Sequence, residues 1–174
     1  ARAAKSNGYD LHVIGLDPDP VKIEMLCSRW HGMGILSEQL SAMVGDICTA
    51  EFPPYLAHLI VSEDLEAAGI GNASTFVEKA FYSLRPYGGK ICLGVETLEL
   101  LQQAAASGTL ASTDVRMSGD YAILERVGAL PGSADWTHLY ADASNTVVSK
   151  DTLVKAPLGL LWFGGSVNFN VLPR

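Results

Sequence analysis

The sequence predicts an α/β fold in which helices cover both faces of a mostly parallel sheet. Short apolar segments rich in β-branched residues alternate with segments whose apolar residues recur at i, i+3, i+4 and i+7. Glycine and proline separate these segments at short intervals, and several of the apolar segments end on an acidic residue. Strands and helices that alternate at this spacing are typical of parallel sheets with crossover helices.

The most informative segment is LHVIGLDPDP, residues 11–20. Its apolar part predicts a buried parallel strand, and Asp17 follows at the carboxyl end of that strand, where open α/β sheets bind ligands. Asp19 suits the N-cap of a helix, and Pro20 suits its first position. In nucleotide-binding βαβ units, an acidic residue at the place of Asp17 accepts hydrogen bonds from a ribose.

The remaining elements follow the same alternation of strand and helix. Three helices are expected: one from Pro20 with an apolar face that ends near Gly32, one capped by Ser74 that ends before Pro86, and one over 97–106. Further strands are expected at 40–44, 57–61, 90–95, 115–117 and 121–127.

Three successive predicted strands end in acidic residues, namely Asp17, Asp46, and the pair Glu63 and Asp64. The carboxyl ends of parallel strands share one rim of a sheet, so we expect these carboxylates to line a common ligand cleft. Each has a purely structural alternative, because Asp17 and Asp46 can stabilise turns, and Glu63 or Asp64 can cap a helix. The coincidence of all three at one rim favours the cleft.

Composition and charge narrow the classes of function. The 174 residues are 48% hydrophobic, which suffices for a domain with a sizeable core, and no apolar run reaches transmembrane length. Residues 1–128 carry the whole net charge of −7, whereas 129–174 are neutral overall. The absence of a basic stripe argues against nucleic acid or a membrane as partner, so a small-molecule substrate is expected. Cys27, Cys48 and Cys92 lack metal-ligand spacing and are expected to be free thiols.

The succession VIGLD, helix, MVGDI, LIVSEDL and LRPYGGKICL resembles class I S-adenosylmethionine-dependent methyltransferases from their second strand onward. The turn LRPYGG, residues 84–89, is the most specific part, because many members end a helix with a similar turn before their fifth strand. The resemblance covers 1–128 and implies a Rossmann-like domain, N-terminally truncated, without its first strand and glycine-rich cofactor loop. We therefore expect these 174 residues alone to bind the cofactor weakly or not at all.

The resemblance also implies residues that bind the cofactor. Asp17 would bind the ribose hydroxyls of S-adenosylmethionine, and Pro18 would lie beside the adenine. Asp46 would accept a hydrogen bond from the adenine amino group, and Ile47 would lie against the ring. Ser62, at the end of the next strand, would face the methyl donor and acceptor.

By the same resemblance, Glu63 and Asp64 are the candidate catalytic residues. They would act as a base or orient the methyl acceptor. Methyl transfer to a neutral nucleophile needs alignment and sometimes a base, and little else from the protein, so a stronger catalytic signature is not expected. No metal site is expected.

Residues 129–174 differ in kind from the rest, being rich in Gly, Ser, Asn and Asp and without helical periodicity. The segment WTHLYADASNT at 136–146, followed by PLGLLWFGG, resembles the entry into a quinoprotein-type, PQQ-binding-like β-propeller. The resemblance implies a linker and the first propeller strand, at 158–163, with PQQ as cofactor only of propeller parts outside this sequence. The alternative is an extension that packs on the α/β domain. His138 is expected to be packed or hydrogen-bonded rather than a metal ligand.

Three functional hypotheses follow. The first is a methyltransferase that acts on a small molecule within a polypeptide that also carries the propeller, these 174 residues being inactive alone. The second is a non-catalytic Rossmann-like module that supports a quinoprotein-type propeller with a binding or redox role. The third is an NAD-type dinucleotide-binding domain, where Asp17 would also bind a ribose. A methyltransferase would be expected in the cytoplasm, and a true quinoprotein in the periplasm. The sequence leaves the oligomeric state open.

Overall fold

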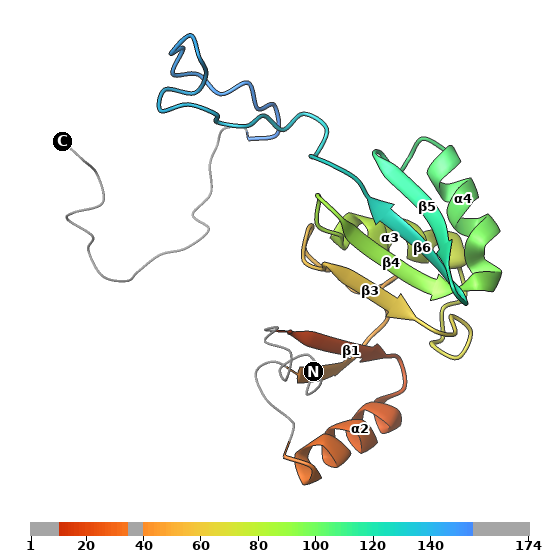
Figure 1. Cartoon of the computed structure of the whole chain (residues 1–174). Helices are drawn as coiled ribbons and strands as arrows, with labels where there is room; N and C mark the ends of the chain where they lie inside the picture. Colours follow the sequence, from red (N-terminus) through yellow and green to blue (C-terminus); the bar gives the residue numbers. More distant parts are fainter. Residues whose placement is uncertain (1–10, 35–39, 155–174) are drawn as a thin grey trace. The chain divides into compact units, whose positions relative to one another are not determined.

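The computed structural model describes residues 11–34 and 40–154, and the chain divides into two compact units, Ala1–Ala129 and Leu130–Arg174 (Figure 1). Unit 1 has the predicted α/β architecture. Its elements are, in order, β1 (Val13–Asp17), α2 (Pro20–Gly32), β2 (Leu40–Val44), β3 (Leu59–Ser62), α3 (Ala73–Ser83), β4 (Gly89–Gly94), the 3-10 helix η1 (Val95–Thr97), α4 (Leu98–Ala106), β5 (Thr113–Ser118) and β6 (Tyr121–Arg126). Within the described ranges, no helix is long and apolar enough to span a membrane.

The strands of unit 1 form two sheets rather than one. β1 and β2 pair in parallel, and Asp17 stands opposite Val44. The second sheet has the order β3-β4-β6-β5. β3 and β4 are parallel, whereas the pairings of β6 with β4 and with β5 are antiparallel. The last two strands are antiparallel because the tight turn after Ser118 joins them as a hairpin.

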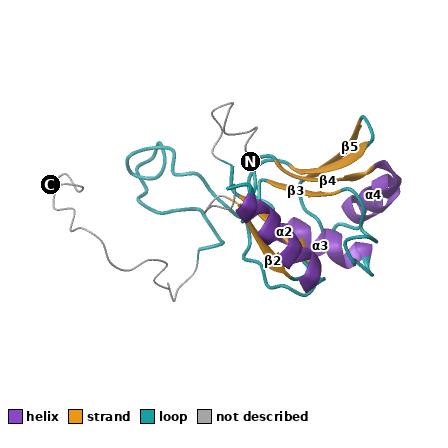
Figure 2. Ribbon diagram, turned by 90° about the horizontal axis from the view of Figure 1, so that it is seen from below, coloured by secondary structure: helices purple, strands orange, loops and turns teal. Residues whose placement is uncertain are grey.

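The hydrophobic core lies between the four-stranded sheet and the helices α3 and α4, which lie on the same face of this sheet (Figure 2). Ile91, Leu93 and Leu124 from the sheet are fully buried, as are Val77 of α3 and Leu101 of α4. Burial of one such side chain stabilises the fold by about 1.5–3 kcal/mol. Residues along β4 alternate between buried and half-buried, so that one face of the strand contacts the helices.

Two element boundaries differ from the sequence prediction for identifiable reasons. The N-cap of α3 is Asn72, whose Oδ1 accepts a hydrogen bond from the Thr75 N–H at 3.0 Å, whereas the predicted cap, Ser74, lies in the first turn. The third strand begins at Leu59 rather than Ala57, because Ala57 forms an isolated bridge with Leu84 instead. By contrast, α2 begins as predicted, since the Asp19 side chain accepts from the Val21 N–H.

Unit 2 is held in shape by two aspartates, and its described part, 130–154, contains no helix or strand longer than one bridge. Asp142 accepts hydrogen bonds from the backbone of Ser144 and from both the backbone and hydroxyl of Thr146. Asp151 accepts three backbone hydrogen bonds, from Ala134, Leu153 and Val154. The predicted propeller strand at 158–163 lies outside the described residues.

Candidate functional site

Asp17 and Asp46 lie at the same edge of one parallel sheet. Asp17 is the last residue of β1, and Asp46 follows β2 after Gly45. The two strands pair in parallel, and the Gly45 N–H donates to the Asp17 carbonyl at 3.0 Å, which fixes the two strand ends beside each other. This is the placement expected from the sequence, while the ligand roles of both residues remain predictions.

The Asp17 carboxylate is oriented by the turn that leads into α2. Its Oδ1 accepts from the Asp19 N–H at 2.8 Å, and its Oδ2 lies 3.4 Å from Lys22 Nζ. The side chain is partly exposed, so it retains room for a ligand. Sequence reasoning missed Lys22; the available signal was its position in the first turn of the helix that Asp19 caps.

The Asp46 carboxylate stabilises the turn after β2 through one of its oxygens. Its Oδ1 accepts from the Cys48 N–H at 2.8 Å. Ile47 and Cys48 then pack against the hydrophobic core, and burial together with the Asp46 charge raises the pKa of the Cys48 thiol. Ile47 also lines a groove of about 450 Å³ beside α3. Phe52 and Tyr82 line the same groove.

The two catalytic candidates have different surroundings at the end of β3. Asp64 Oδ1 accepts from the backbone N–H groups of Glu66 and Ala67, both at 2.9 Å, so this carboxylate caps a turn. The Ser62 hydroxyl donates to the Asp64 carbonyl at 3.3 Å. Glu63 is exposed and makes no hydrogen bond or ion pair with another described residue. Glu63 is therefore the candidate whose carboxylate is available to a substrate.

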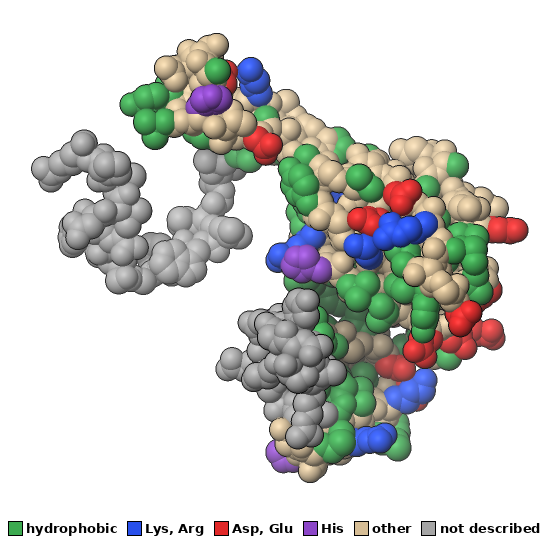
Figure 3. All heavy atoms as spheres, in the orientation of Figure 1, with side chains coloured by type: hydrophobic (Ala, Val, Ile, Leu, Met, Phe, Trp, Pro, Cys, Tyr) green, Lys and Arg blue, Asp and Glu red, His purple; other side chains and the backbone are tan. Residues whose placement is uncertain are grey.

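The loops after β1 and β3 touch each other at Pro18 and Gly69. Gly69 has a φ of +75°, and a Cβ placed on it would lie 2.8 Å from Pro18 Cγ, so only glycine allows this approach. The contact joins the rim of the two-stranded sheet to the loop that carries Glu63 and Asp64. Figure 3 shows acidic side chains gathered at this end of unit 1. The sequence did contain a signal for this contact, a glycine in the loop after the third strand, but the contact was not predicted from it.

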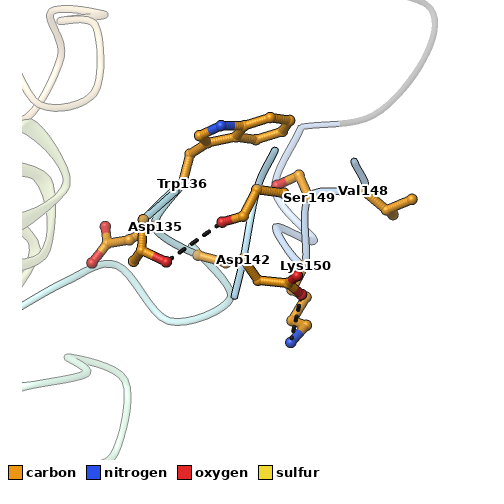
Figure 4. A pocket seen from close by; sticks show the side chains of 9 residues that line it. Asp135, Trp136, Asp142, Val148, Ser149 and Lys150 are labelled. Carbon is orange, nitrogen blue, oxygen red and sulfur yellow. Dashed lines mark hydrogen bonds and ion pairs between the residues drawn. The ribbon is translucent and has the colours of Figure 1, made fainter. Parts of the chain in front are cut away.

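Unit 2 contains a separate small cavity of about 140 Å³ that the sequence did not predict. Trp136, Val148 and Ser149 contribute to its lining, together with Asp142, which forms an ion pair with Lys150 at 3.5 Å (Figure 4). His138 Nδ1 lies 2.8 Å from the Thr137 hydroxyl, so His138 is hydrogen-bonded, as expected. Over residues 11–34 and 40–154, no cluster of His, Cys, Asp or Glu could hold a metal ion.

Comparison with known proteins shows likeness of fold. No protein-family model and no curated protein sequence matches the chain. Among solved structures, one from Methanococcus maripaludis assigned as an S-adenosylmethionine-dependent methyltransferase superposes with a TM-score of 0.57 at 15% identity, over 74% of this chain and 73% of that one. An S-adenosylmethionine-dependent methyltransferase from Aquifex aeolicus gives 0.52 at 11% identity, over 71% and 72%.

The fold is the Rossmann-like one of S-adenosylmethionine-dependent methyltransferases. A phosphoethanolamine N-methyltransferase from Haemonchus contortus, solved with phosphomonomethylethanolamine and S-adenosylhomocysteine, also matches, with a TM-score of 0.51 at 20% identity. The match covers 66% of this chain and 31% of that enzyme. Other matches also span well under two thirds of the matching chain, for example 32% of a [4+2]-cyclase.

Proposed function

We propose that the polypeptide containing these residues transfers a methyl group from S-adenosylmethionine to a small-molecule acceptor. Unit 1 supplies the adenosine side of the cofactor site. The observation that carries the proposal is the pair of carboxylates, Asp17 and Asp46, at the carboxyl ends of two adjacent parallel strands. The fold shared with methyltransferase structures supports the same assignment.

The two carboxylates fit the hydrogen-bonding groups of adenosine. A ribose diol presents two hydroxyl donors, which the partly exposed Asp17 carboxylate can accept. The adenine amino group is a donor that suits the Asp46 carboxylate, because a carboxylate can accept several hydrogen bonds and its Oδ1 already accepts one from the Cys48 N–H. Bound S-adenosylmethionine supplies the activated methyl group, while these residues hold and orient its adenosine part.

The roles near the methyl acceptor divide between the two candidates at the end of β3. Glu63, which is exposed and makes no ion pair with the described residues, orients the acceptor or accepts its proton. Asp64 keeps the loop in shape through its two backbone hydrogen bonds. The acceptor itself is a small molecule, in keeping with the acidic, non-basic surface of the chain.

Calorimetric titration of the full polypeptide with S-adenosylhomocysteine tests the proposal. Asp17→Ala should weaken binding by roughly 1–3 kcal/mol, because charge-assisted hydrogen bonds to the ribose are lost. Asp120→Ala is the matched control, since this exposed aspartate lies in the hairpin between β5 and β6, and should leave the affinity unchanged. Equal affinity of the wild type and Asp17→Ala would remove Asp17 from the site.

We also propose that residues 130–174 open a β-propeller domain in the same polypeptide. The second compact unit begins at Leu130, directly after Ala129, and the composition of the chain changes near the same place. The resemblance of 136–146 to a propeller entry supports this assignment. A structure of a longer polypeptide tests this proposal. It would be contradicted if 158–163 packs on the helices of unit 1 and does not pair with further strands.

A further inference from the structure

Unit 1 has a groove of about 450 Å³ between the loop that follows β2 and the helix α3. The loop contributes one wall, and the second half of α3 contributes the other. The lining residues are Ile47, Ala50, Glu51 and Phe52 of the loop and Glu78, Lys79, Tyr82 and Ser83 of the helix. Pockets for small molecules have volumes of roughly 300–1,000 Å³, so the groove is large enough for a small ligand.

The α3 wall of the groove lies away from the rim that carries Asp17 and Ser62. The Ala57 N–H donates to the Ser83 carbonyl at 2.9 Å, so the end of α3 lies beside the segment that leads into β3. Ser62 is at the other end of β3. Of the lining residues, Ile47 alone is also assigned to the proposed cofactor site. A ligand in the groove would therefore be separate from bound S-adenosylmethionine.

Ser83 places a buried hydroxyl at the groove. The residue is 4% exposed, and over 11–34 and 40–154 its side chain makes no hydrogen bond. In the same ranges no fully enclosed side-chain oxygen lacks a partner, so this hydroxyl is not sealed in the core. It reaches the groove that Ser83 lines. A buried hydroxyl without a partner costs free energy, which a hydrogen bond to a ligand would recover.

The α3 wall carries two rows of different chemistry. Residues four apart on a helix are neighbours on successive turns, so Glu78 lies beside Tyr82, and Lys79 lies beside Ser83. One row thus offers a carboxylate and an aromatic ring, and the other an ammonium group and a hydroxyl. The side chains of Glu78, Lys79 and Glu51 are exposed and form no ion pair within the described part of the chain.

The Lys79 ammonium group lies on the side of α3 that faces the loop. Burial and the Asp46 charge raise the pKa of the Cys48 thiol, and the Lys79 charge partly opposes this rise. Interactions between charges are screened by salt over about 10 Å, so the ammonium group is near the loop residue Cys48. Lys79 therefore extends toward the opposite wall of the groove.

We propose that this groove binds an α-amino acid with an apolar side chain. The ammonium group of the amino acid donates to Glu78 and Glu51 and lies against the ring of Tyr82. Its carboxylate pairs with Lys79 and accepts a hydrogen bond from the Ser83 hydroxyl. Each of the unpaired polar groups of the groove then has a partner of opposite character.

The apolar part of the ligand packs on the remaining lining residues. Phe52 is half-buried and Tyr82 is 55% exposed, and together with Ile47 they offer an apolar surface in the groove. An amine without a carboxylate would leave Lys79 unpaired beside a second positive charge. A carboxylate without an amine would lie beside Glu51 and Glu78. The charges of the groove therefore favour a ligand that carries both groups.

Titration of the full chain with L-phenylalanine, followed by NMR and calorimetry, tests the proposal. The amides of Phe52, Glu78 and Ser83 should shift saturably, whereas that of Asp17 should not. Phenethylamine lacks the carboxylate and 3-phenylpropionate lacks the ammonium group, so each should bind roughly tenfold more weakly or worse. The proposal is overturned if L-phenylalanine does not bind saturably, if either analogue binds as tightly, or if the shifts are confined to the rim.

Charge variants identify the groups that bind the ligand. Glu78→Gln and Lys79→Gln should each lower the affinity for L-phenylalanine roughly tenfold, because each removes a charge-assisted hydrogen bond. Glu99→Gln is the matched control, since Glu99 is exposed on the neighbouring helix α4 and does not line the groove. It should leave the affinity unchanged. A loss for Glu99→Gln as large as that for Glu78→Gln would mean that the net charge, and not the groove, governs binding.

Ser83→Ala separates a binding role from a structural one. The hydroxyl makes no hydrogen bond to a described residue, so the midpoint of urea denaturation should not change. Affinity for L-phenylalanine should fall roughly three- to tenfold through the loss of one hydrogen bond. Unchanged affinity would remove Ser83 from the site and overturn the proposed arrangement. Because none of these measurements involves S-adenosylmethionine, failure of the groove is distinguishable from failure of the proposed methyl transfer.

Discussion

Arg126, the last residue of β6, joins the four-stranded sheet of unit 1 to the end of α3. Its NH1 donates to the carbonyl of Leu84 at 2.9 Å and to that of Phe81 at 3.3 Å. Its guanidinium lies over the rings of Phe81 and Tyr55, with centroid distances of 4.5 and 5.2 Å. Partial burial lowers the pKa of Arg126 from its ordinary value, yet a guanidinium stays charged at neutral pH. The last carbonyls of a helix lack intrahelical partners, and Arg126 supplies them.

Arg126→Met is expected to lower the free energy of unfolding by roughly 1–3 kcal/mol, because hydrogen bonds from a charged donor to the helix end are lost. Urea denaturation followed by circular dichroism measures the change. Arg116→Met is the control, since Arg116 pairs with Glu125 and Asp114 on the exposed face of the sheet, where ion pairs contribute little. A loss for Arg116→Met as large as that for Arg126→Met would contradict the assignment.

At the scale of single residues, the sequence predicted positions better than roles. Asp17 and Asp46 were placed at one sheet edge because each ends an apolar strand, and the structure has them there. The turn made by Asp64 was one of two readings that the sequence left open, because a carboxylate after a strand suits a cap and a ligand site equally well. The contact between Pro18 and Gly69 joins loops that are far apart in the sequence, and no local pattern predicts such a pair.

The start of α3 provides a test at the scale of one element. Asn72 accepts from the Thr75 N–H, whereas Ser74 is exposed within the first turn. Asn72→Ala should cost about 0.5–2 kcal/mol of unfolding free energy through loss of the cap, while Ser74→Ala should cost less than about 0.5 kcal/mol. Thermal denaturation of both variants gives the comparison. A larger effect for Ser74→Ala would mean that the sequence-based assignment of the cap was right.

Element types were predictable here, and element boundaries less so. The apolar periodicity of 77, 80, 81 and 84 identified α3, and the turn at Gly88 and Gly89 before an apolar segment identified β4, because both patterns are local. The choice between Asn72 and Ser74 depends on backbone conformation at the cap: both residue types are good caps, and only the structure shows that Asn72 is extended. The division into two sheets depends on pairings between distant strands, which the sequence order alone did not predict.

At the scale of the whole molecule, two units meet at a short connection. The last backbone bonds of unit 1 include that from the Tyr87 N–H to the Gly128 carbonyl, at 2.9 Å. The first residues of unit 2 are hydrogen-bonded to the last described residues of the same unit, since the Thr152 N–H donates to the Gly132 carbonyl at 2.8 Å. Residues 129–131 lie between these two hydrogen bonds and therefore connect the units. The hydrogen bonds locate the boundary between the units more closely than the change in composition does.

Limited proteolysis should cut at 129–131 first and leave a stable product that ends near Gly128. Mass spectrometry of the early fragments locates the cut. The product should be more soluble than the whole chain, because unit 2 exposes large apolar side chains, among them Trp136, Leu139 and Val148. A first cut within the four-stranded sheet, with 129–131 resistant, would contradict a boundary between the units.

The two aspartates that hold the turns of unit 2 make its order sensitive to acid. Their hydrogen bonds, chiefly from the backbone of Thr146 to Asp142 and from the backbone of Val154 and Leu153 to Asp151, lower the pKa of each carboxyl below its ordinary value of 3.8. A carboxyl whose pKa is lower in the folded state stabilises that state above the ordinary value, and the contribution is lost as pH falls through the lowered one. Unit 1 depends instead on an apolar core that protons do not neutralise. In an acid titration followed by NMR, the amides of Ser144 and Leu153 should therefore lose their dispersed shifts at a pH where that of Leu124 keeps its own. If the amides of both units lose their dispersed shifts at the same pH, the two carboxylates do not hold the turns of unit 2. If those of unit 2 lose them first, acid unfolds unit 2 while unit 1 stays folded.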